Sequence, residues 1–509
     1  MTAVKAVIKP DIYRDSIFLM KLSAEAARAS GVDAVSAMMA TERNKELFAA
    51  SGLMTPEIQA AKAGDLAIAI KGPEELADKA VAAVMRLIDA APAGPAASGE
   101  GGAAAPADIA GAKQAAPGLN FALISVAGDY ARYEAAEALA SGMDVMLYSD
   151  NISLADELAL KRMAAKKGLL VMGPDCGTAI VGGAPLAFAN AVRRGHVGIV
   201  GASGTGLQEV CCLLDRLGVG VSDAYGTGGR DLRDDIGGIT AFAAIDRLAA
   251  DGDTEALIIL GKPPGKETRA KLLERLRRFG KPVFAHYVGA ADYAAENAAG
   301  IVTAMDLTDL SVKAARHFRK DAALPEAAHP AIKGKGGLLH GIFGGGTLCQ
   351  EAAEICGRLL PGDKYSNLSV DGFAKIGGGD NPAGHVFLDL GEDEFTVGRP
   401  HPMMAPDLKM ERVVGALCNP EVRVVLMDMV IGYGAHPEQA RLAAEALAAA
   451  AAKSGGKSRE KAVVASVCGT EADRPGRAAQ AAELAGAGVV VLPSNAMAAR
   501  YAAAIAKGE

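Results

Sequence analysis

Two glycine-rich turns carry the residues of this sequence that are best suited to binding an anion. Each turn follows an apolar run typical of a strand and precedes a helical pattern that contains Gln-Glu. Glycines let a ligand approach the backbone closely, and free N–H groups at a helix N-terminus favour negative charge. The pattern predicts a phosphate or other anion site, whose members are Ser203, Gly204, Thr205 and Gly206 in the first turn and Gly344, Gly345, Gly346 and Thr347 in the second.

The spacing of the glycines in the first turn bears on which kind of ligand site it can form. Residues Gly201–Gly206 do not form a G-x-G-x-x-G fingerprint with a distal acidic residue, so a dinucleotide site is only weakly indicated. No Lys-Ser/Thr pair closes the turn, so it is not a P-loop. The plain alternative is a tight connection between a strand and a helix that binds nothing.

Four further side chains are candidates for catalysis. Glu209 lies near the first turn of the helix after Ser203, where a carboxylate can orient a partner, accept a proton or compensate the helix dipole. Arg230 and Arg399 occupy matching places in the two halves, and a guanidinium fork suits a carboxylate or a phosphate. His401 lies in a Pro-containing loop, where it can act as a general acid. The alternative for the two arginines and the histidine is a solvated loop.

Substrate contacts are expected from other strand ends. Gly173–Thr178 ends a predicted strand, and open α/β sheets bind ligands at the carboxyl ends of their strands. This places Asp175 and Cys176 in the substrate site. Cys176 is a possible nucleophile, but no His lies near it in sequence, and a buried structural thiol is the favoured interpretation. His436 lies in another loop with Gly and Pro, and it is a second candidate for binding a substrate carboxylate or acting as the acid.

A parallel-sheet framework is needed to bring these residues together. Residues 4–88 alternate short strands and helices and predict a small α+β domain. From 119 to about 317, and again from 338 to 506, strands alternate with helices, which predicts parallel sheets covered on both faces. Two Ala/Pro/Gly-rich stretches between these parts read as linkers. The half-motif repeated at 198–212 and 341–354 indicates that the two later α/β domains are related.

The composition excludes several other classes of protein. The 509 residues carry a net charge of −7 and contain no basic block, so nucleic-acid binding is not expected. No charge-free apolar run reaches about 18 residues, which argues against a membrane span. Seven scattered cysteines favour a reducing cytoplasm over a disulfide framework. The N-terminus reads as a strand rather than a signal peptide. No CxxC or HExxH motif indicates a metal site.

Several motifs resemble a known family. Residues 119–320 resemble the α-subunit of succinyl-CoA synthetase and its acyl-CoA ligase relatives, through Gly173–Gly177, Val197–Thr205, Glu209, Gly226–Gly238, Ile258–Gly261 and Lys281–Phe284. Residues 338–506 look like the ligase domain of the β-subunit, through Phe387–Gly391 and Val424–Gly434. The segments Tyr13–Met20, Asn44–Leu47 and Gly398–Pro402 look like the FdrA family.

This resemblance implies the fold and its order. The implied fold class is α/β, with a small N-terminal α+β domain followed by a Rossmann-like domain and two flavodoxin-like, succinyl-CoA-ligase-type domains with parallel sheets. The implied boundaries are 1–90 for the N-terminal domain, 91–117 for a linker, 118–192 for the Rossmann-like CoA-binding-type domain, 193–320 for the first ligase-type domain, 321–337 for a linker and 338–509 for the second ligase-type domain.

The sequence also departs from the ligases. Asn297 stands at about the place of the histidine that carries phosphate in a ligase, and an amide cannot become phosphohistidine, which leaves Asn297 as a substrate contact. The CoA fingerprint near the N-terminus is missing, so CoA is a possible ligand without an assigned site, and no cofactor is certain. An ATP-grasp domain is missing as well. Synthesis of an acyl-CoA through a phosphorylated enzyme is therefore disfavoured.

FdrA proteins are similar to a subunit of oxamate carbamoyltransferase, which acts in allantoin and ureide breakdown. The resemblance therefore implies a cytoplasmic carbamoyltransferase subunit that uses phosphate or carbamoyl phosphate and an acid of the oxamate or oxalurate type. It implies separately encoded partner subunits and an oligomer, with no nucleic-acid or membrane partner. Two alternatives stay open. One is an NDP-forming acyl-CoA synthetase with His286 or His340 as the nearest substitute histidines, and the other is a non-catalytic scaffold or regulatory subunit.

Overall fold

The computed structural model describes residues 2–10, 12, 18–19, 22–23, 26–27, 30–90, 106–325, 336–380, 382–396 and 399–509. The FdrA-like motif at Tyr13–Met20, the interiors of both expected linkers and Gly398 lie largely or wholly outside these residues. The chain divides into two compact units, Met1–Ala105 with Thr396–Pro400 and Pro106–Phe395 with His401–Glu509. The units are described separately below.

The N-terminal unit is built around one central strand. The antiparallel sheet has the order β1 (Thr2–Lys9), β3 (Leu66–Pro73), β2 (Ala34–Met39), and three described helices accompany it, α2 (Glu42–Ala50), α3 (Pro56–Ala60) and α4 (Glu74–Ala90). Leu66, Ile68 and Ile70 of β3 pack with the apolar side of α4, whereas Ala67 and Ala69 pack with Phe48 and Ile58 on the other face. Alternate side chains of β3 therefore serve two cores, which confirms the small N-terminal α+β domain.

A small parallel sheet begins the second unit. Its strands have the order β4 (Phe121–Ile124), β5 (Asp144–Leu147), β6 (Val171–Met172), and the helices nearby are α5 (Ile109–Ala115), α6 (Gly128–Ala140) and α7 (Leu154–Lys166). Alanines of α6 and Leu139 pack on Val145 and Leu147, since small side chains let this helix lie close to the sheet. This small sheet and its helices have the strand–helix alternation expected for a Rossmann-like domain.

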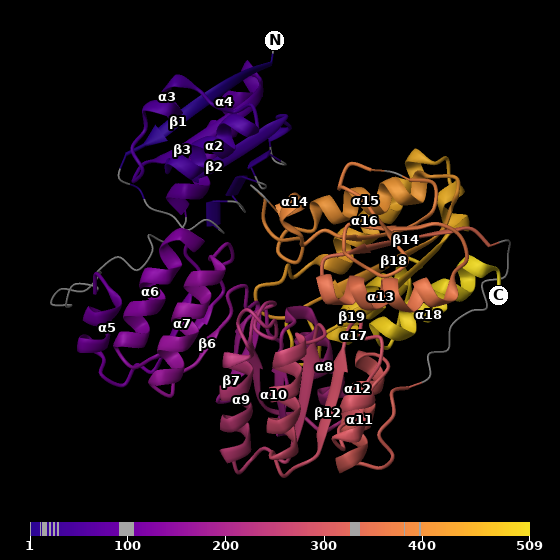
Figure 1. Ribbon diagram of the computed structural model, residues 1–509. Helices are drawn as coiled ribbons and strands as arrows, with labels where there is room; N and C mark the ends of the chain where they lie inside the picture. The colour runs from indigo at the N-terminus through magenta and orange to yellow at the C-terminus, as the bar shows by residue number, and fades with distance from the viewer. Residues whose placement is uncertain are drawn as a thin grey trace. The chain divides into compact units, whose positions relative to one another are not determined.

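Two seven-stranded sheets form the rest of the second unit (Figure 1). The first has the order β13 (Val302–Thr303), β12 (Val283–Tyr287), β11 (Ala256–Gly261), β9 (Arg194–Gly201), β10 (Val221–Gly226), β7 (Thr178–Val181), β8 (Ala184–Ala187). Its helices are α8 (Gly204–Arg216), α9 (Ile239–Ala250), α10 (Lys266–Arg277), α11 (Ala294–Ala298) and α12 (Leu307–Phe318). Only the hairpin of β7 and β8 is antiparallel to its neighbours in this sheet.

The second large sheet is parallel throughout. Its order is β16 (Ala374–Lys375), β15 (Lys364–Ser366), β17 (His385–Asp389), β14 (Leu338–Phe343), β18 (Val422–Val430), β19 (Ala462–Cys468), β20 (Val490–Leu492). Its helices are α13 (Gly346–Leu359), α14 (Asp393–Thr396), α15 (Asp407–Cys418), α16 (Gln439–Lys453), α17 (Arg477–Gly486) and α18 (Asn495–Lys507), with a short 3-10 turn η1 (Lys457–Glu460).

The topology confirms that the two sheets are related. In the first sheet β10, β9, β11, β12 and β13 are neighbours in that order, and in the second β17, β14, β18, β19 and β20 are. Counted along the chain from β9, the first order is 2-1-3-4-5, which is the flavodoxin-like arrangement. The second order, counted from β14, is the same once β15 and β16, which lie between β14 and β17 in the chain, are left out. The strands β9 and β14 each lead into one of the two glycine-rich turns, and those turns lie at the carboxyl edges of their sheets.

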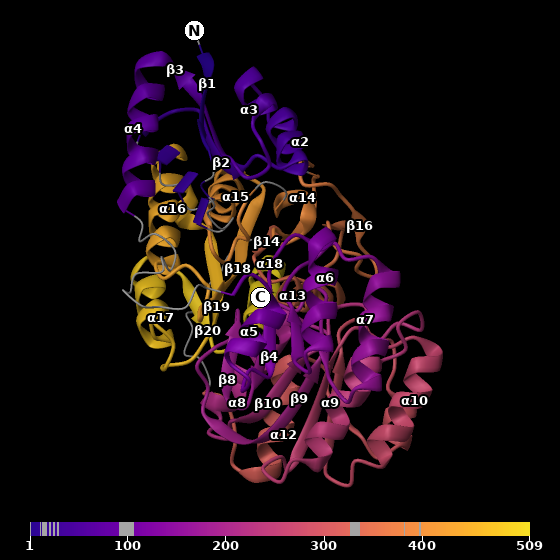
Figure 2. The same cartoon turned by 90° about the vertical axis from the view of Figure 1, so that its left-hand side faces the viewer.

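The two ligase-type domains pack through four helices. Helix α8 lies against α12 and α13, and α13 lies against α18, as Figures 1 and 2 also show for α13 and α18. One apolar cluster runs across this interface and includes Val210 of α8, Leu310 of α12, Cys356 of α13 and Ala499 of α18. Among the described residues, no helix has both the length and the apolar content needed to cross a bilayer.

Candidate functional site

The two glycine-rich turns meet in the structure. Ser203 is the N-cap of α8 and accepts the N–H of Gly206 at 3.1 Å, and its Oγ lies 2.6 Å from Oγ1 of Thr347 at the start of α13. A Cβ on Gly345 would stand only 2.9 Å from Cγ2 of Thr205. The sequence therefore predicted correctly that residues from both turns share one place.

The two turns differ in what occupies their donors. The N–H groups of Gly344 and Gly345 donate to the carboxylate of Asp428, at 2.9 and 2.8 Å. Asp428 lies near the end of β18, is fully buried, and pairs with the ammonium of Lys409 at 2.5 Å. The second turn thus already holds an anion, which belongs to the protein itself. This feature was not expected from the sequence, which treated Gly344 and Gly345 as donors to a ligand.

The first turn keeps its donors open. Within the described part of the chain, no acceptor lies on the N–H of Gly204 or of Thr205. Ser203 and Gly204 are half-buried, as are Gly346 and Thr347 opposite them. An anion at the start of α8 would meet these two N–H groups, the positive end of the helix dipole and the neighbouring hydroxyls.

Two titratable groups adjoin the second turn. Asp389 ends β17, and its Oδ1 accepts the N–H of Gly391 at 2.8 Å. A Cβ on Gly391 would stand 2.7 Å from Nε2 of His401 and 3.1 Å from Oδ1 of Asp389, so the imidazole and the carboxyl group flank one glycine. Gly346 is equally close to Asp389, since a Cβ there would stand 2.5 Å from Oδ2. His401 is therefore placed beside the turns, together with a carboxylate that the sequence interpretation did not single out.

Burial sets the proton affinity of both groups. It raises the pKa of Asp389 to about 7, with a further rise from the charges of Glu392 and Asp428 and a reduction from the Gly391 N–H and the charge of Lys262. It lowers the pKa of His401 to about 4, against the opposing charge of Asp428. A carboxyl group that titrates near neutrality beside a neutral imidazole is suited to proton transfer.

Glu209 has a different place from the one expected. Its carboxylate accepts the N–H of Asn495, the first residue of α18, at 3.1 Å, and burial raises its pKa. Glu351 holds the equivalent place on α13, and it accepts the N–H of Leu307, the first residue of α12, at 2.8 Å. Each carboxylate thus caps the last helix of the other ligase-type domain. This contact explains Glu209 without any role in the reaction.

Arg230 is not placed at the turns, and Arg399 belongs to the other compact unit. Arg230 pairs with Glu157 at 2.8 Å and donates to the carbonyl of Ile152, also at 2.8 Å. Glu157 in turn pairs with Lys161, whose ammonium bonds Asp231 in a fully buried network between α7 and the loop after β10. Arg399 is exposed, and it belongs to the segment Thr396–Pro400 that groups with the N-terminal unit.

The expected substrate contacts are dispersed. The thiol of Cys176 is buried against the carbonyls of Thr178 and Gly226, and burial raises its pKa to about 12, which suits a structural cysteine. Asp175 is exposed, with a φ of 56°. Asn297 is exposed on α11, where it accepts the hydroxyl of Thr303 at 2.9 Å. Among the described residues no hydrogen bond joins these three residues to the two turns, although the charges of Glu392, Asp393 and Arg230 act on the carboxyl group of Asp175.

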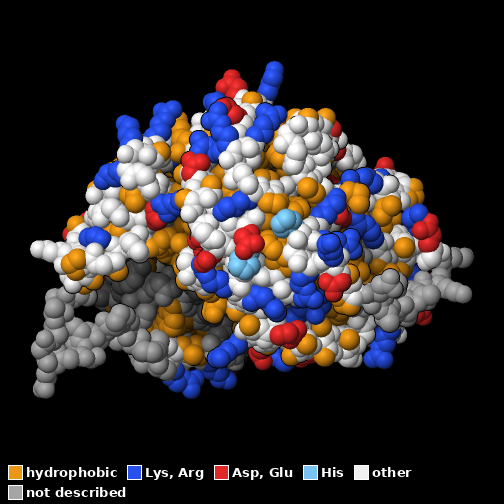
Figure 3. Space-filling view, turned by 90° about the horizontal axis from the view of Figure 1, so that it is seen from below, with side chains coloured by type: hydrophobic (Ala, Val, Ile, Leu, Met, Phe, Trp, Pro, Cys, Tyr) orange, Lys and Arg blue, Asp and Glu red, His pale blue; other side chains and the backbone are white. Residues whose placement is uncertain are grey.

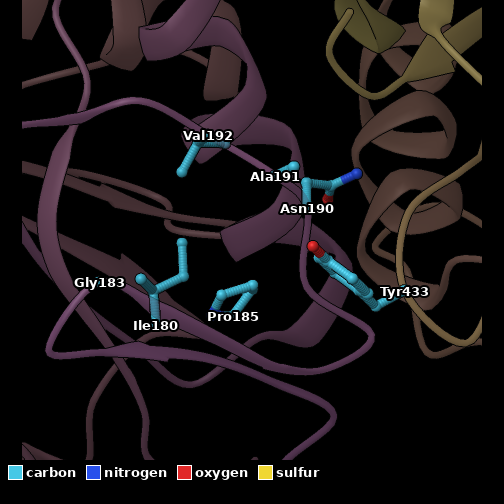
Figure 4. A pocket seen from close by; sticks show the side chains of 7 residues that line it. All are labelled: Ile180, Gly183, Pro185, Asn190, Ala191, Val192 and Tyr433. Carbon is cyan, nitrogen blue, oxygen red and sulfur yellow. The ribbon is translucent and has the colours of Figure 1, made fainter. Parts of the chain in front are cut away.

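His436 lies in the loop after β18, and its Nδ1 accepts the N–H of Glu438 at 3.1 Å. The same loop carries Tyr433, whose N–H donates to the carbonyl of Ala189 at 3.0 Å. Figure 4 shows Tyr433 beside Pro185 and Asn190 at a pocket of 170 Å³. The loop therefore contacts the segment after β8 through a backbone hydrogen bond, and His436 is half-buried in the same loop.

Comparison with known proteins places the chain in a family. The family model "CoA-ligase" matches residues 342–505, "CoA binding domain" matches 192–284, and "AllF, heavy metal-associated domain" matches 1–105. YahF of Escherichia coli (strain K12) is 39% identical over 504 residues, which are 97% of this chain and 96% of YahF. The chain belongs to the YahF family. This membership agrees with the resemblance to FdrA and to succinyl-CoA synthetase, which is confirmed.

Ligases match a part of this YahF-family chain. The α-subunit of the ADP-forming succinate–CoA ligase of Aquifex aeolicus is 32% identical over 183 residues, which are 34% of this chain and 57% of that subunit. The apo form of a dinucleotide-forming acetyl-coenzyme A synthetase 1 of Ca. Korarchaeum cryptofilum is 16% identical, covering 76% of this chain and 83% of that one with a TM-score of 0.33. The chain thus spans little more than half of that ligase subunit.

The residues of the N-terminal domain do not fit a heavy metal. Residues 1–105 contain no Cys and no His, so the domain named for heavy metals lacks the thiolate and imidazole ligands that such metals prefer. The described residues contain no group of three metal-ligating side chains.

Proposed function

We propose that the chain is the subunit of a carbamoyltransferase that exchanges a carbamoyl group between phosphate and an acid of the oxamate type. In the catabolic direction, a phosphate oxygen attacks the ureido carbonyl carbon of oxalurate and the C–N bond breaks. The leaving nitrogen takes a proton, and the products are carbamoyl phosphate and oxamate. We place this reaction in ureide breakdown in the cytoplasm, with separately encoded partner subunits in an oligomer.

The open turn of α8 is the observation that carries this proposal. It offers the N–H groups of Gly204 and Thr205 and the hydroxyls of Ser203 and Thr347 to one phosphate. The second turn is closed by Asp428, so the pair of turns offers one anion position rather than two. Substrates held at such a place gain rate through proximity, and charge that develops on the phosphate is stabilised there.

Asp389 and His401 supply the proton chemistry of this proposal. Transfer to the leaving nitrogen needs an acid near neutral pH, and Asp389 has its pKa raised to about 7 by burial. Lys262, an exposed cation in the loop after β11, lies near enough to lower that pKa and has no ion pair in the described chain. The match of residues 1–105 to the allantoin-related AllF domain supports a ureide as the substrate class.

The test is phosphate-dependent breakdown of oxalurate, coupled to detection of carbamoyl phosphate. The chain is assayed alone and with the co-expressed products of neighbouring genes. We expect turnover that needs phosphate and that is lost on Ser203→Ala with Thr205→Ala. Ser51→Ala, which removes an exposed hydroxyl on the N-terminal unit, is the matched control. If turnover survives the double substitution, the phosphate does not bind at the turn before α8.

The ligase relatives favour a second candidate, an NDP-forming acyl-CoA synthetase. Its phosphate carrier would have to be a histidine other than the one replaced by Asn297. His286 is the nearer candidate to a cavity, whereas His340 lies buried within β14 with its pKa lowered to about 4. Acid-labile phosphate on a histidine after incubation with nucleoside triphosphate, absent in His286→Asn, would establish this reaction in place of the first.

A further inference from the structure

A cavity of 530 Å³ lies between the two ligase-type domains, apart from the glycine-rich turns. The loop after β12 and the start of α12 form one side, and the C-terminal half of α13 forms the other. Polar residues His286, Tyr293, Lys313 and Arg358 line it together with the exposed apolar side chain of Met305. Its size is in the range of small-molecule sites.

His286 lines this cavity, and one of its ring nitrogens has no hydrogen-bond partner among the described residues. The residue is 5% exposed, and its Nδ1 lies 3.0 Å from the carbonyl oxygen of Ala304, so Nδ1 carries the ring proton. Burial lowers the pKa of His286 and thereby favours the neutral ring. Nε2 is then a lone pair, and no donor of the described chain bonds it. A ligand that satisfies it must bring an N–H or an O–H.

Arg358 presents open donors to the same cavity. Its Nε donates to the carbonyl of Glu354 one turn earlier, and no acceptor in the described chain lies on its terminal nitrogens. The carboxylate of Glu354 is already engaged by the N–H of Gly289 at 3.0 Å and by Gln350 at 3.2 Å.

The other two cations of the cavity are paired, Lys313 with Asp309 at 2.8 Å and Arg500 with Asp306. Arg358 is therefore the guanidinium that remains to receive an acid, and its fork matches a carboxylate.

We propose that this cavity binds a small carboxylic acid that also carries an N–H or O–H donor. The carboxylate lies on the terminal nitrogens of Arg358, and the donor bonds Nε2 of His286. Because α13 and the loop after β12 belong to different domains, the acid contacts both domains at once. This site does not depend on the transfer reaction proposed above, because none of its residues belongs to the turns.

Calorimetric titration of the full chain with oxamate and with pyruvate tests the proposal. The two probes have nearly the same shape and differ in an amide NH₂ against a methyl group. We expect oxamate to bind about tenfold more tightly, because one hydrogen bond to a buried acceptor distinguishes them. Equal affinities would overturn the assignment of His286.

Three variants separate the parts of the site. Arg358→Ala should abolish the binding of pyruvate and the part of oxamate binding that Ser203→Ala with Thr205→Ala leaves intact, while Arg278→Ala, an exposed arginine on the end of α10, should change neither. His286→Phe should reduce the affinity for oxamate to that for pyruvate and leave pyruvate unchanged. Ser203→Ala with Thr205→Ala should leave oxamate binding intact. Loss of all oxamate binding in this last variant, or its persistence when Arg358→Ala is combined with Ser203→Ala and Thr205→Ala, would place the acid elsewhere, whatever the outcome for oxalurate breakdown.

Discussion

Asp428→Ala tests whether the second turn is closed by the protein's own carboxylate. The side chain is fully buried, accepts two backbone N–H groups and pairs with Lys409. Removing one member of a buried ion pair leaves the other charged and uncompensated, which costs about 3–5 kcal/mol. The two orphaned N–H groups belong to the same network, so their cost is contained in that figure rather than added to it. We expect a loss of about 4 kcal/mol in the free energy of unfolding.

The double variant Asp428→Ala with Lys409→Met separates the charge from the hydrogen bonds. This variant removes the ammonium group that Asp428→Ala leaves buried without a counter-charge. The N–H groups of Gly344 and Gly345 remain without an acceptor. We expect it to be more stable than Asp428→Ala alone, with a remaining loss of about 1–3 kcal/mol for the unsatisfied donors. Lys409→Met by itself should be strongly destabilised, since it leaves the carboxylate unpaired.

Urea unfolding followed by circular dichroism measures these differences, with formate added in parallel to chloride of equal ionic strength. Formate is small enough to replace the lost carboxylate and should raise the stability of Asp428→Ala, while the parent chain should respond to both salts alike. A loss below about 1 kcal/mol in Asp428→Ala would refute the reasoning, given the magnitude for a buried pair. The reasoning would also be refuted if formate stabilises Asp428→Ala no more than chloride does.

Other substitutions test the remaining contacts. Ser203→Ala and Thr347→Val should be non-additive by about 0.5–1.5 kcal/mol in urea unfolding, because their hydroxyls lie 2.6 Å apart, and strictly additive losses would mean that they do not bond. Arg230→Ala should lower the free energy of unfolding by about 1–3 kcal/mol through the loss of a partner of buried Glu157, whereas Arg399→Ala, an exposed position, should stay within about 0.5 kcal/mol of the parent; equal effects would contradict the placement. Burial raises the pKa of Glu351 from 4.5 to about 8, so the folded chain keeps a proton that the unfolded chain loses between these pH values. The free energy of unfolding should therefore fall as the pH rises through this window, by at most about 1.4 kcal/mol per pH unit. Glu351→Gln should flatten the stability profile over that window, and an unchanged slope would show that Glu351 is ionised in the fold.

Local patterns were sufficient for the fold class, but not for the hairpin of β7 and β8, which lies within the expected bounds of the Rossmann-like domain and pairs antiparallel with β10 of the first large sheet. Strands and helices alternate with clear periodicity, and the repeated turn after β9 and β14 identifies the two related domains without any knowledge of contacts. The sequence interpretation also assigned the two turns to one site, and the contact of Ser203 with Thr347 confirms that the turns meet.

The partners of individual side chains could not be read in the same way. Asp389 and Asp428 end strands that flank β14 in the sheet, yet the chain separates them from the second turn by an intervening helix or more. The cap that Glu209 provides lies on α18, in the other domain. Such contacts depend on strand order and on domain packing, which single-sequence patterns do not encode. The run Phe387–Gly391 did contain Asp389, and its place at a strand end was the one available signal.

The exchange of helix caps between the ligase-type domains has a consequence for how this chain can be divided. Each half has a complete sheet of its own, but the last helix of each half is finished by a carboxylate that the other half supplies. A chain cut between residues 325 and 336 would give two fragments, each with an open helix end and an apolar face. Those fragments should recognise each other and reassociate, as separately made subunits do. One polypeptide here is thus a covalently joined heterodimer, in which the linker sets the effective concentration of the halves rather than their mutual specificity.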